Sequence, residues 1–246
     1  MIVFVTGGSR GIGEAIVLEA VRQGHDVAFT YLHQRDLAEA VVAKARSLYP
    51  ERQVAAYALD VRDSAAVEAV GDRVVDDFGT LDVLVANAGI NLNGLVVSTS
   101  DADWQAVIDT NLTGTFYVCR QFLTTFLANG FGRIIMLSSL GHSGVSGQAS
   151  YAASKAGLLG LSATLAKEYG RKGITSNVVL PGFFETDMTR DGMSDANREF
   201  WLRYCPLGRT GAVNEVAGVV LFLASEAASY INGQAIAVNG GLGWAP

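Results

Sequence analysis

A tyrosine and a lysine stand four residues apart, at Tyr151 and Lys155, near the start of a segment with helical periodicity. Residues at this spacing share one face of a helix, so the phenol and the ammonium project together. A free phenol has a pKa of about 10, too high for a base at neutral pH, and a nearby cation favours the phenolate. The pair predicts a general acid and base for proton transfer to an oxygen, although the same spacing also occurs in pairs that only decorate a helix.

A glycine-rich loop near the N-terminus, Thr6–Gly13, has the sequence TGGSRGIG and directly follows an apolar strand pattern. Glycines allow a tight turn and a close approach of the backbone to a phosphate, and the helix that follows offers free N–H groups. The loop predicts a dinucleotide pyrophosphate site, with the spacing TGxxxGxG rather than GxGxxG. The residues expected to hold the cofactor here are Gly7, Ser9, Arg10, Gly11, Ile12 and Gly13.

The end of the second expected strand indicates which dinucleotide fits. An acidic residue there usually binds the ribose 2′-hydroxyl of NAD. None occurs before Asp36, whereas Arg10, His33 and Arg35 supply basic groups. A 2′-phosphate suits such groups, so the sequence favours NADP(H) as the cofactor. The alternative is that Arg10 and Arg35 are solvated surface charges.

The elements that must position these residues alternate between short apolar strands and longer helical patterns, which is typical of a parallel sheet covered on both faces. We expect an α/β fold, a single Rossmann-type doubly wound domain over residues 1–246 with a seven-stranded parallel sheet. The least regular segment, 182–211, is long for a connection and is predicted to be a substrate lid. The expected strands are Ile2–Thr6, Asp26–Tyr31, Val54–Asp60, Leu81–Asn87, Gly132–Ser138, Thr175–Leu180 and Gln234–Val238. The expected helical patterns are Gly11–Gln23, Asp36–Leu48, Ser64–Phe78, Asp101–Ala128, Ser150–Gly170 and Val213–Ala224.

Composition excludes several classes of function. The formal net charge is −6, which argues against a general nucleic-acid binder because such proteins need a basic face. No run approaches the roughly 18 apolar residues of a membrane span, and the N-terminus lacks the features of a signal peptide. The two cysteines, Cys119 and Cys205, have no metal-ligand spacing and indicate free thiols. We expect a cytoplasmic protein without a metal site.

Further motifs accompany the tyrosine and lysine. They are Asp60-Val61, Asn87-Ala88-Gly89, Asn111, the pair Ser138-Ser139 and Pro181-Gly182. Together with the glycine-rich loop they give the chain a resemblance to the short-chain dehydrogenases/reductases over nearly its whole length. Within that family, Gly147–Gly160, Pro181–Met188 and Ala237–Gly241 are most similar to 3-oxoacyl-[acyl-carrier-protein] reductases.

The resemblance implies roles for these residues. Tyr151 resembles the general acid and base, Lys155 the residue that lowers the tyrosine pKa and binds the nicotinamide ribose, and Asn111 the residue that holds a water in a proton relay. Asn111 would otherwise be an amide that only satisfies helix backbone. The resemblance further implies cofactor contacts, in addition to the loop, from Asp60, Val61, Asn87, Ala88, Gly89, Tyr151, Lys155, Pro181, Gly182, Phe184 and Thr186.

The catalytic serine is either Ser138 or Ser139. Counting from the strand start at Arg133 places the family position on Ser139, whereas counting back from Tyr151 by the commonest spacing gives Ser138. The loop between them therefore looks one residue short. Because strand register is stiffer than loop length, and a slip of one residue turns the side chain to the other face, we choose Ser139.

The subfamily resemblance implies reduction of a 3-oxoacyl thioester, carried by acyl carrier protein, with NADPH. An acidic carrier would dock on basic residues. The candidates are Arg133, Arg171 and Lys172, and the alternative is that these three are ordinary solvated charges. Four aromatic side chains near the lid would either accept a long or aromatic acyl chain or simply pack the lid: Phe183, Phe184, Trp201 and Tyr204. The role of His142 stays open.

The alternative functions are a reductase for another ketone or alcohol, such as a sugar, steroid or small ketone, and a non-catalytic NADP(H) sensor. Kinship further implies a homotetramer, or a homodimer, that pairs the long helices.

Overall fold

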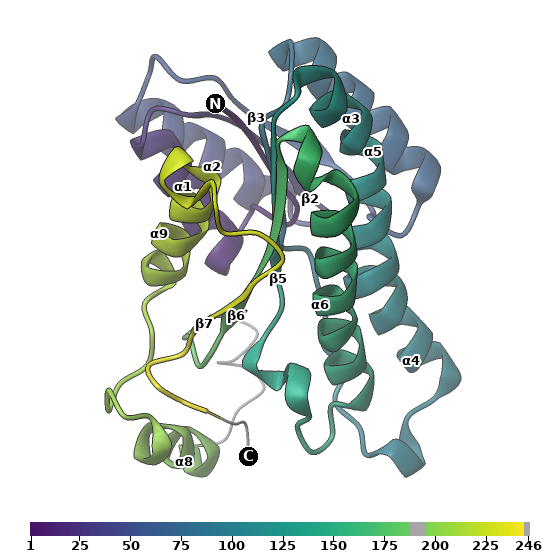
Figure 1. Ribbon diagram of the computed structural model, residues 1–246. Coiled ribbons are helices and arrows are strands. Elements are labelled where there is room, and N and C mark those ends of the chain that lie inside the picture. The colour runs from purple at the N-terminus through teal and green to yellow at the C-terminus, as the bar shows by residue number, and fades with distance from the viewer. Residues whose placement is uncertain (187–194, 244–246) are drawn as a thin grey trace.

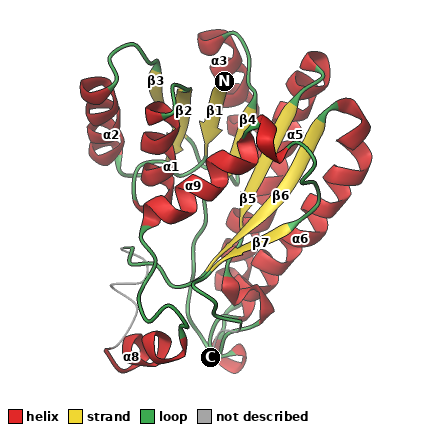
Figure 2. Ribbon diagram, turned by 60° about the vertical axis from the view of Figure 1, so that its left-hand side comes forward, coloured by secondary structure: helices red, strands yellow, loops and turns green. Residues whose placement is uncertain are grey.

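Seven parallel strands form one sheet in the order β3-β2-β1-β4-β5-β6-β7 (Figure 1; all seven strands are labelled in Figure 2). The computed structural model describes residues 1–186 and 195–243. The change of direction in the strand order falls between β1 and β4, which is where ligands bind in doubly wound sheets. The strands are β1 Ile2–Val5, β2 Asp26–Tyr31, β3 Val54–Ala58, β4 Val83–Ala86, β5 Gly132–Leu137, β6 Ile174–Pro181 and β7 Ala235–Val238.

Helices cover both faces of the sheet. Helices α1, α2 and α9 lie on one face and α3, α4, α5 and α6 on the other, while α8 lies beyond the sheet near the C-terminal residues (Figures 1 and 2). The helices are α1 Gly11–Arg22, α2 Arg35–Leu48, α3 Ser64–Phe78, α4 Asp101–Ile108, α5 Gly114–Asn129, α6 Ala149–Tyr169, α8 Asp195–Tyr204 and α9 Val213–Ala224. Short turns of helix complete the fold at η1 Val96–Ser98, η2 Asp109–Thr113, η3 Leu140–Ser143, η4 Gly170–Lys172 and η5 Glu226–Ala228.

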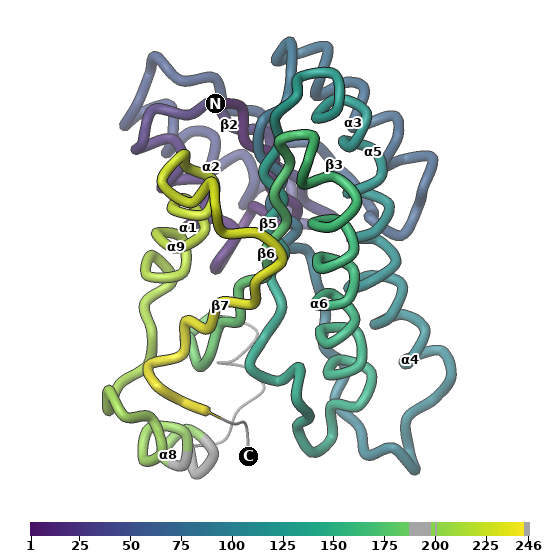
Figure 3. The backbone as a smooth tube through the Cα atoms, in the orientation of Figure 1, coloured from purple at the N-terminus to yellow at the C-terminus, as the bar shows by residue number. Residues whose placement is uncertain are grey.

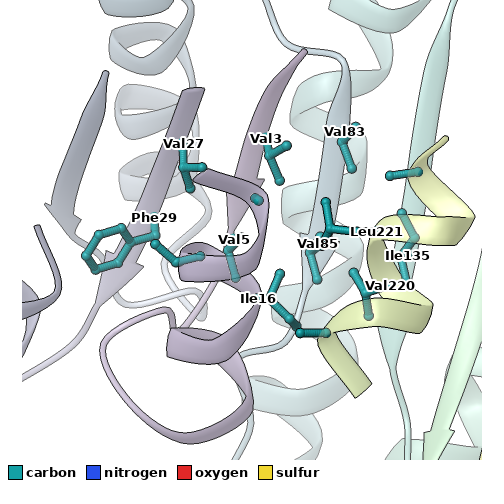
Figure 4. Close-up of a cluster of buried hydrophobic side chains, with 14 of the residues drawn as sticks. Val3, Val5, Ile16, Val27, Phe29, Val83, Val85, Ile135, Val220 and Leu221 are labelled. Carbon is teal, nitrogen blue, oxygen red and sulfur yellow. The ribbon is translucent and has the colours of Figure 1, made fainter. Parts of the chain in front are cut away.

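The alternation of side chains along each strand explains why both faces are covered. Val3 and Val5 pack with α1 and α9 in one apolar cluster, part of which is drawn in Figure 4, whereas Phe4 between them packs with α3 and α5 in a second cluster. Because successive strand side chains point to opposite faces, a strand without polar residues must be buried on both. The expected α/β doubly wound sheet of seven parallel strands is confirmed.

The expected elements lie within two residues of the observed ones, with two exceptions. The pattern at Asp101–Ala128 is not one helix: α4 and α5 are separated by the π-helical turn η2, which contains Asn111. The expected lid 182–211 is not irregular throughout, because it contains helix α8, and its residues 187–194 lie outside the described part of the chain.

The parallel arrangement brings distant parts of the sequence to one edge. Every helix between neighbouring strands runs back along the sheet, so the carboxyl ends of the strands meet the starts of the helices that follow them. This edge holds the loop before α1, the end of β4, the serines after β5 and the start of α6 (Figure 3).

No helix in the described ranges is long and apolar enough to cross a membrane. Within the same ranges, no group of His, Cys, Asp and Glu side chains forms a metal site.

Candidate active site

The glycine-rich loop packs so tightly that its glycines are required. A Cβ atom on Gly13 would lie 2.1 Å from the carbonyl oxygen of Gly7, and Gly7 itself has a positive φ of 68°. The N-cap residue of α1, Arg10, makes no capping hydrogen bond to the first turn through its side chain. Such a turn at a helix start fits the pyrophosphate of a dinucleotide.

Residues at the end of β4 form hydrogen bonds with this loop. The side-chain amide of Asn87 donates hydrogen bonds of 3.0 Å to the carbonyl oxygens of Thr6 and Gly7. In return, the hydroxyl of Thr6 accepts from the backbone N–H groups of Asn87 and Ala88 at 3.0 Å. Asn87 and Ala88 therefore hold the glycine-rich loop Thr6–Gly13, called the phosphate loop below after the group expected there, against the central strands. The sequence did not reveal this contact.

The segment after β3 lies beside the start of α5. The carboxylate of Asp60 accepts three hydrogen bonds from the Arg62 guanidinium, at 2.9, 3.1 and 2.6 Å, and this pairing holds the pKa of Asp60 below its usual range. Val61 is buried, and its side chain would lie 2.7 Å from a Cβ atom on Gly114. The expected adenine-flanking pair is thus fixed at the carboxyl end of β3.

The groups that favour NADP(H) follow β2. The backbone N–H of Gly8 donates to the carbonyl oxygen of Thr30, so the phosphate loop and the end of β2 lie together. Arg35 opens α2 and forms an ion pair of 2.7 Å with Glu39, which leaves 74% of its side chain exposed. A pairing this exposed contributes little, so Arg35 stays available to a phosphate.

Lys155 lies buried beneath the Tyr151 ring. Its Nζ atom donates a 2.6 Å hydrogen bond to the carbonyl oxygen of Leu137, the last residue of β5, and lies 5.7 Å from the centre of the Tyr151 ring. Burial lowers the pKa of the Lys155 ammonium to about 8. Burial raises the pKa of the Tyr151 phenol, and a hydrogen bond from Ser139 opposes part of that rise. The tyrosine and lysine, four residues apart, do form one site at the start of α6.

The two serines after β5 have different partners. The Ser138 hydroxyl is buried and donates a 2.8 Å hydrogen bond to the backbone oxygen of Lys155. The Ser139 hydroxyl accepts a 3.0 Å hydrogen bond from the N–H of Gly141 and faces the Tyr151 phenol. The geometry therefore brings Ser139 to the tyrosine and leaves Ser138 in a structural role.

Asn111 lies in the π-helical turn η2 and is completely buried. Its side-chain amide donates to the Ile90 carbonyl at 2.9 Å and to the Ser154 hydroxyl at 3.0 Å, and its side-chain oxygen accepts from the Ile90 N–H at 2.8 Å. Gly89 passes close by, since a Cβ atom there would lie 3.1 Å from that oxygen and 3.4 Å from the Lys155 Nζ. Asn111 therefore joins α6 to the β4 loop and borders Lys155, with both of its amide hydrogens already used.

The segment after β6 closes the site on another side. Gly182 packs against Asn239, and the buried Phe184 ring leaves no room for a Cβ atom on Gly211. The Thr186 side chain lies 3.7 Å from the Cβ position of Gly11 in the phosphate loop. Pro181 and its neighbours thus lead the chain from the sheet to the loop where a cofactor would lie.

Apolar side chains of α8 and of the C-terminal residues form a cluster beside this segment. The rings of Phe183 and Trp201 stack with centres 5.8 Å apart, and Trp201 packs against Leu140, Cys205 and Leu242. A cavity of about 280 Å³ lies among these side chains. Sequence reasoning missed Leu140, Cys205 and Leu242, because only the fold brings these three distant positions together.

The expected docking residues do not lie at this edge. Arg133 is only 4% exposed, at the amino end of β5, where its guanidinium covers the Phe131 ring at 4.2 Å. Arg171 and Lys172 form the turn η4 just before β6. All three positions lie at the edge of the sheet opposite to Tyr151 in the same chain. The prediction that Arg133 is a docking residue is wrong, because its side chain is buried. Arg171 and Lys172 do not border this chain's own site.

Known proteins share both the sequence and the fold. The family described as "Enoyl-(Acyl carrier protein) reductase" matches residues 7–243. The chain is 44% identical over 241 residues to "3-oxoacyl-[acyl-carrier-protein] reductase FabG" of Staphylococcus aureus (strain Mu50 / ATCC 700699), covering 97% of this chain and 96% of the relative. The chain belongs to the short-chain dehydrogenase/reductase family.

Further relatives agree with this membership. FabG of Escherichia coli (strain K12) is 42% identical over 98% of this chain and 96% of its own length. Levodione reductase has a TM-score of 0.93 at 31% identity and covers 98% of this chain and 96% of its own. The structure titled gox2181 also has a TM-score of 0.93, at 33% identity, and covers 98% of this chain and 95% of its own. The protein is accordingly an oxidoreductase that acts on CH–OH groups, in a family that uses nicotinamide cofactors.

Proposed function

We propose that this protein reduces a 3-oxoacyl thioester carried by acyl carrier protein to the 3-hydroxyacyl product with NADPH, and that Tyr151 donates the proton. The observation that carries the proposal is the cluster of Ser139, Tyr151 and Lys155 at the same sheet edge as the phosphate loop. The FabG relatives, at 42–44% identity over nearly the whole chain, favour this substrate.

The phosphate loop fits a dinucleotide, because Gly7 and Gly13 leave a cradle that a Cβ atom would fill, and because the loop leads into the N-terminus of α1. Arg10, His33 and Arg35 favour the 2′-phosphate of NADPH, since the end of β2 has no acid to bind a ribose hydroxyl. When bound there, the cofactor supplies the hydride that adds to the C3 carbonyl carbon. The other cofactor contacts that we propose are Asp60, Val61, Asn87–Gly89, Pro181, Gly182, Phe184 and Thr186.

The chain's own groups handle the oxygen and its proton. The Ser139 hydroxyl and the Tyr151 phenol hold the C3 oxygen of the substrate, and the phenol O–H gives its proton to that oxygen as the carbon is reduced. The buried Lys155 ammonium then stabilises the phenolate that is left behind. Asn111, which borders Lys155, belongs to the path by which a proton returns to the tyrosine.

A second substrate class is supported by one observation. The stacked rings of Phe183 and Trp201 line a cavity of about 280 Å³ beside the site, and such a surface suits a cyclic ketone as well as an acyl chain. Levodione reductase, whose fold matches closely, is named for a ketone of another kind.

The two functions are separated by one assay series. Purified protein is mixed with NADPH and acetoacetyl groups, carried either by coenzyme A or by acyl carrier protein, and the loss of absorbance of the reduced nicotinamide is followed. NADH and a cyclic diketone are tested in parallel. Faster turnover with NADPH and the carrier-bound substrate supports the proposal. Turnover of the cyclic ketone alone contradicts it and favours the second class.

Assembly and location complete the proposal. Trp104, Phe116 and Leu127 are each about two-fifths exposed on α4 and α5, which is a large apolar area for a solvated face. We infer that these helices and α6 pair between copies in a homotetramer or homodimer, and that the protein works in the cytoplasm.

A further inference from the structure

In the turn that follows Ser139, a histidine bonds back to that serine, beside hydrogen bonds from the N–H groups of Gly141 and Gly144 within the turn. In η3, the Nδ1 atom of His142 lies 2.9 Å from the backbone oxygen of Ser139. The backbone N–H of His142 donates to the same oxygen at 3.1 Å. A single residue, His142, therefore makes two contacts with the backbone oxygen of Ser139, one through its ring and one through its backbone.

The partner of the ring fixes its tautomer. A carbonyl oxygen only accepts hydrogen bonds, so Nδ1 must carry the hydrogen, and in the neutral ring Nε2 is left as an acceptor. A protonated ring carries a hydrogen on Nδ1 as well. The bond to Ser139 is thus kept in both charge states of the histidine.

The fold of this turn determines where the Ser139 hydroxyl points. Its oxygen accepts from the N–H of Gly141 at 3.0 Å, which leaves its own hydrogen for the Tyr151 phenol. Gly141 also lies against the tyrosine, since a Cβ atom there would be 3.6 Å from the ring. Farther along, Gly144 and Gly147 have positive φ, and the carbonyl oxygen of Gly147 accepts a 2.8 Å hydrogen bond from the N–H of Gly94, so the far end of the loop is held independently of the ring.

We propose that His142 is a positioning residue, whose Nδ1–H clamps the turn after Ser139 and so aims the serine hydroxyl at the reacting oxygen. Its kinetic consequences rest on the proposed function.

Three substitutions separate the functions of the ring. His142→Asn keeps a donor near the position of Nδ1, His142→Gln moves the donor out toward Nε2, and His142→Phe keeps only the bulk. We expect His142→Asn to stay within about threefold of the wild-type kcat, and the other two to lose about 10- to 100-fold, with an unchanged KM for NADPH. Full activity of His142→Phe overturns the proposal, as does an active His142→Gln beside an inactive His142→Asn, which would indicate a substrate contact by Nε2.

A double substitution tests whether the ring acts through the serine. In a Ser139→Ala background there is no hydroxyl to aim, so His142→Phe should lower kcat by less than about twofold. In the Ser139 background, His142→Phe should also shift the pH dependence of alcohol oxidation to higher pH, because the serine hydrogen bond that lowers the Tyr151 pKa is weakened. Equal losses in both backgrounds, or an unshifted profile, mean that the ring does not act through Ser139.

The clamp is also measurable without substrate. The chain has three histidines, so nitrogen NMR of the imidazoles gives few signals, and His142→Phe identifies the pair that belongs to residue 142. At a pH where the ring is neutral, we expect a hydrogen on Nδ1 and none on Nε2. The opposite tautomer overturns the clamp. An enzyme that turns over no ketone overturns the proposed function instead, and the tautomer still decides the clamp.

Discussion

At the scale of single residues, the two adjacent serines that follow β5 have different partners. Ser139 faces Tyr151, and Ser138 binds the backbone of the helix that holds Lys155. We expect Ser139→Ala to lower kcat about 10²- to 10³-fold, as the loss of one donor to a developing oxyanion does. Ser138→Ala should keep most activity and lose about 1–2 kcal/mol of unfolding free energy, through one buried hydrogen bond. Steady-state kinetics and urea unfolding of both variants measure this, and a reversed order of kcat losses would contradict the assignment.

We expect Lys155 to set an upper pH limit for reduction. Its ammonium has a pKa of about 8, so it is charged below that pH and loses its charge as the pH rises through it. The neutral amine no longer stabilises the tyrosine phenolate. We expect kcat/KM for ketone reduction, which reports the free enzyme, to be flat below about pH 8 and to fall tenfold per unit above it. A profile that stays flat to pH 10 would show that the charge of Lys155 does not limit the reaction.

At the scale of elements, the turn between β1 and α1 depends on the missing side chain of Gly13. An added methyl group would lie 2.1 Å from the Gly7 carbonyl oxygen, and no flexible side chain can move aside. We expect Gly13→Ala to abolish NADPH binding in a fluorescence titration. Gly218→Ala is the matched control, because it lies within α9 with nothing near its Cβ position, and should bind normally while gaining up to about 1 kcal/mol of stability. Tight NADPH binding by Gly13→Ala would rule out the assigned pyrophosphate site.

Most of the elements were predictable from sequence, because apolar runs and glycine-rich turns are local signals. The π-helical turn η2 was not predictable, since Asn111 is held there by Ile90 and Ser154 from other segments. The burial of Arg133 and the cluster around Trp201 likewise depend on contacts between distant positions. What sequence reasoning missed is set by tertiary contacts and not by local pattern.

At the scale of the whole molecule, the exposed apolar residues of α4 and α5 lead us to expect that these helices pair between copies of the chain. Trp104 and Phe116 are 41% and 42% exposed, and Arg120 lies 5.2 Å from the Phe116 ring. We expect sedimentation velocity to show a homotetramer or homodimer of the 25.9 kDa chain, and Trp104→Glu with Phe116→Glu to shift it toward the monomer. A wild-type protein that sediments only as a monomer would refute the pairing of these helices.

The proposed function requires that the protein binds NADPH and a 3-oxoacyl thioester together at Tyr151. The most direct test compares wild type with Tyr151→Phe, using NADPH and acetoacetyl-acyl carrier protein, and measures NADPH binding and turnover on the same samples. The account predicts equal binding, rapid turnover by wild type and a loss of at least about 10²-fold in the variant, since the proton donor is gone. Comparable turnover by Tyr151→Phe, or none by a wild type that binds NADPH, would contradict it.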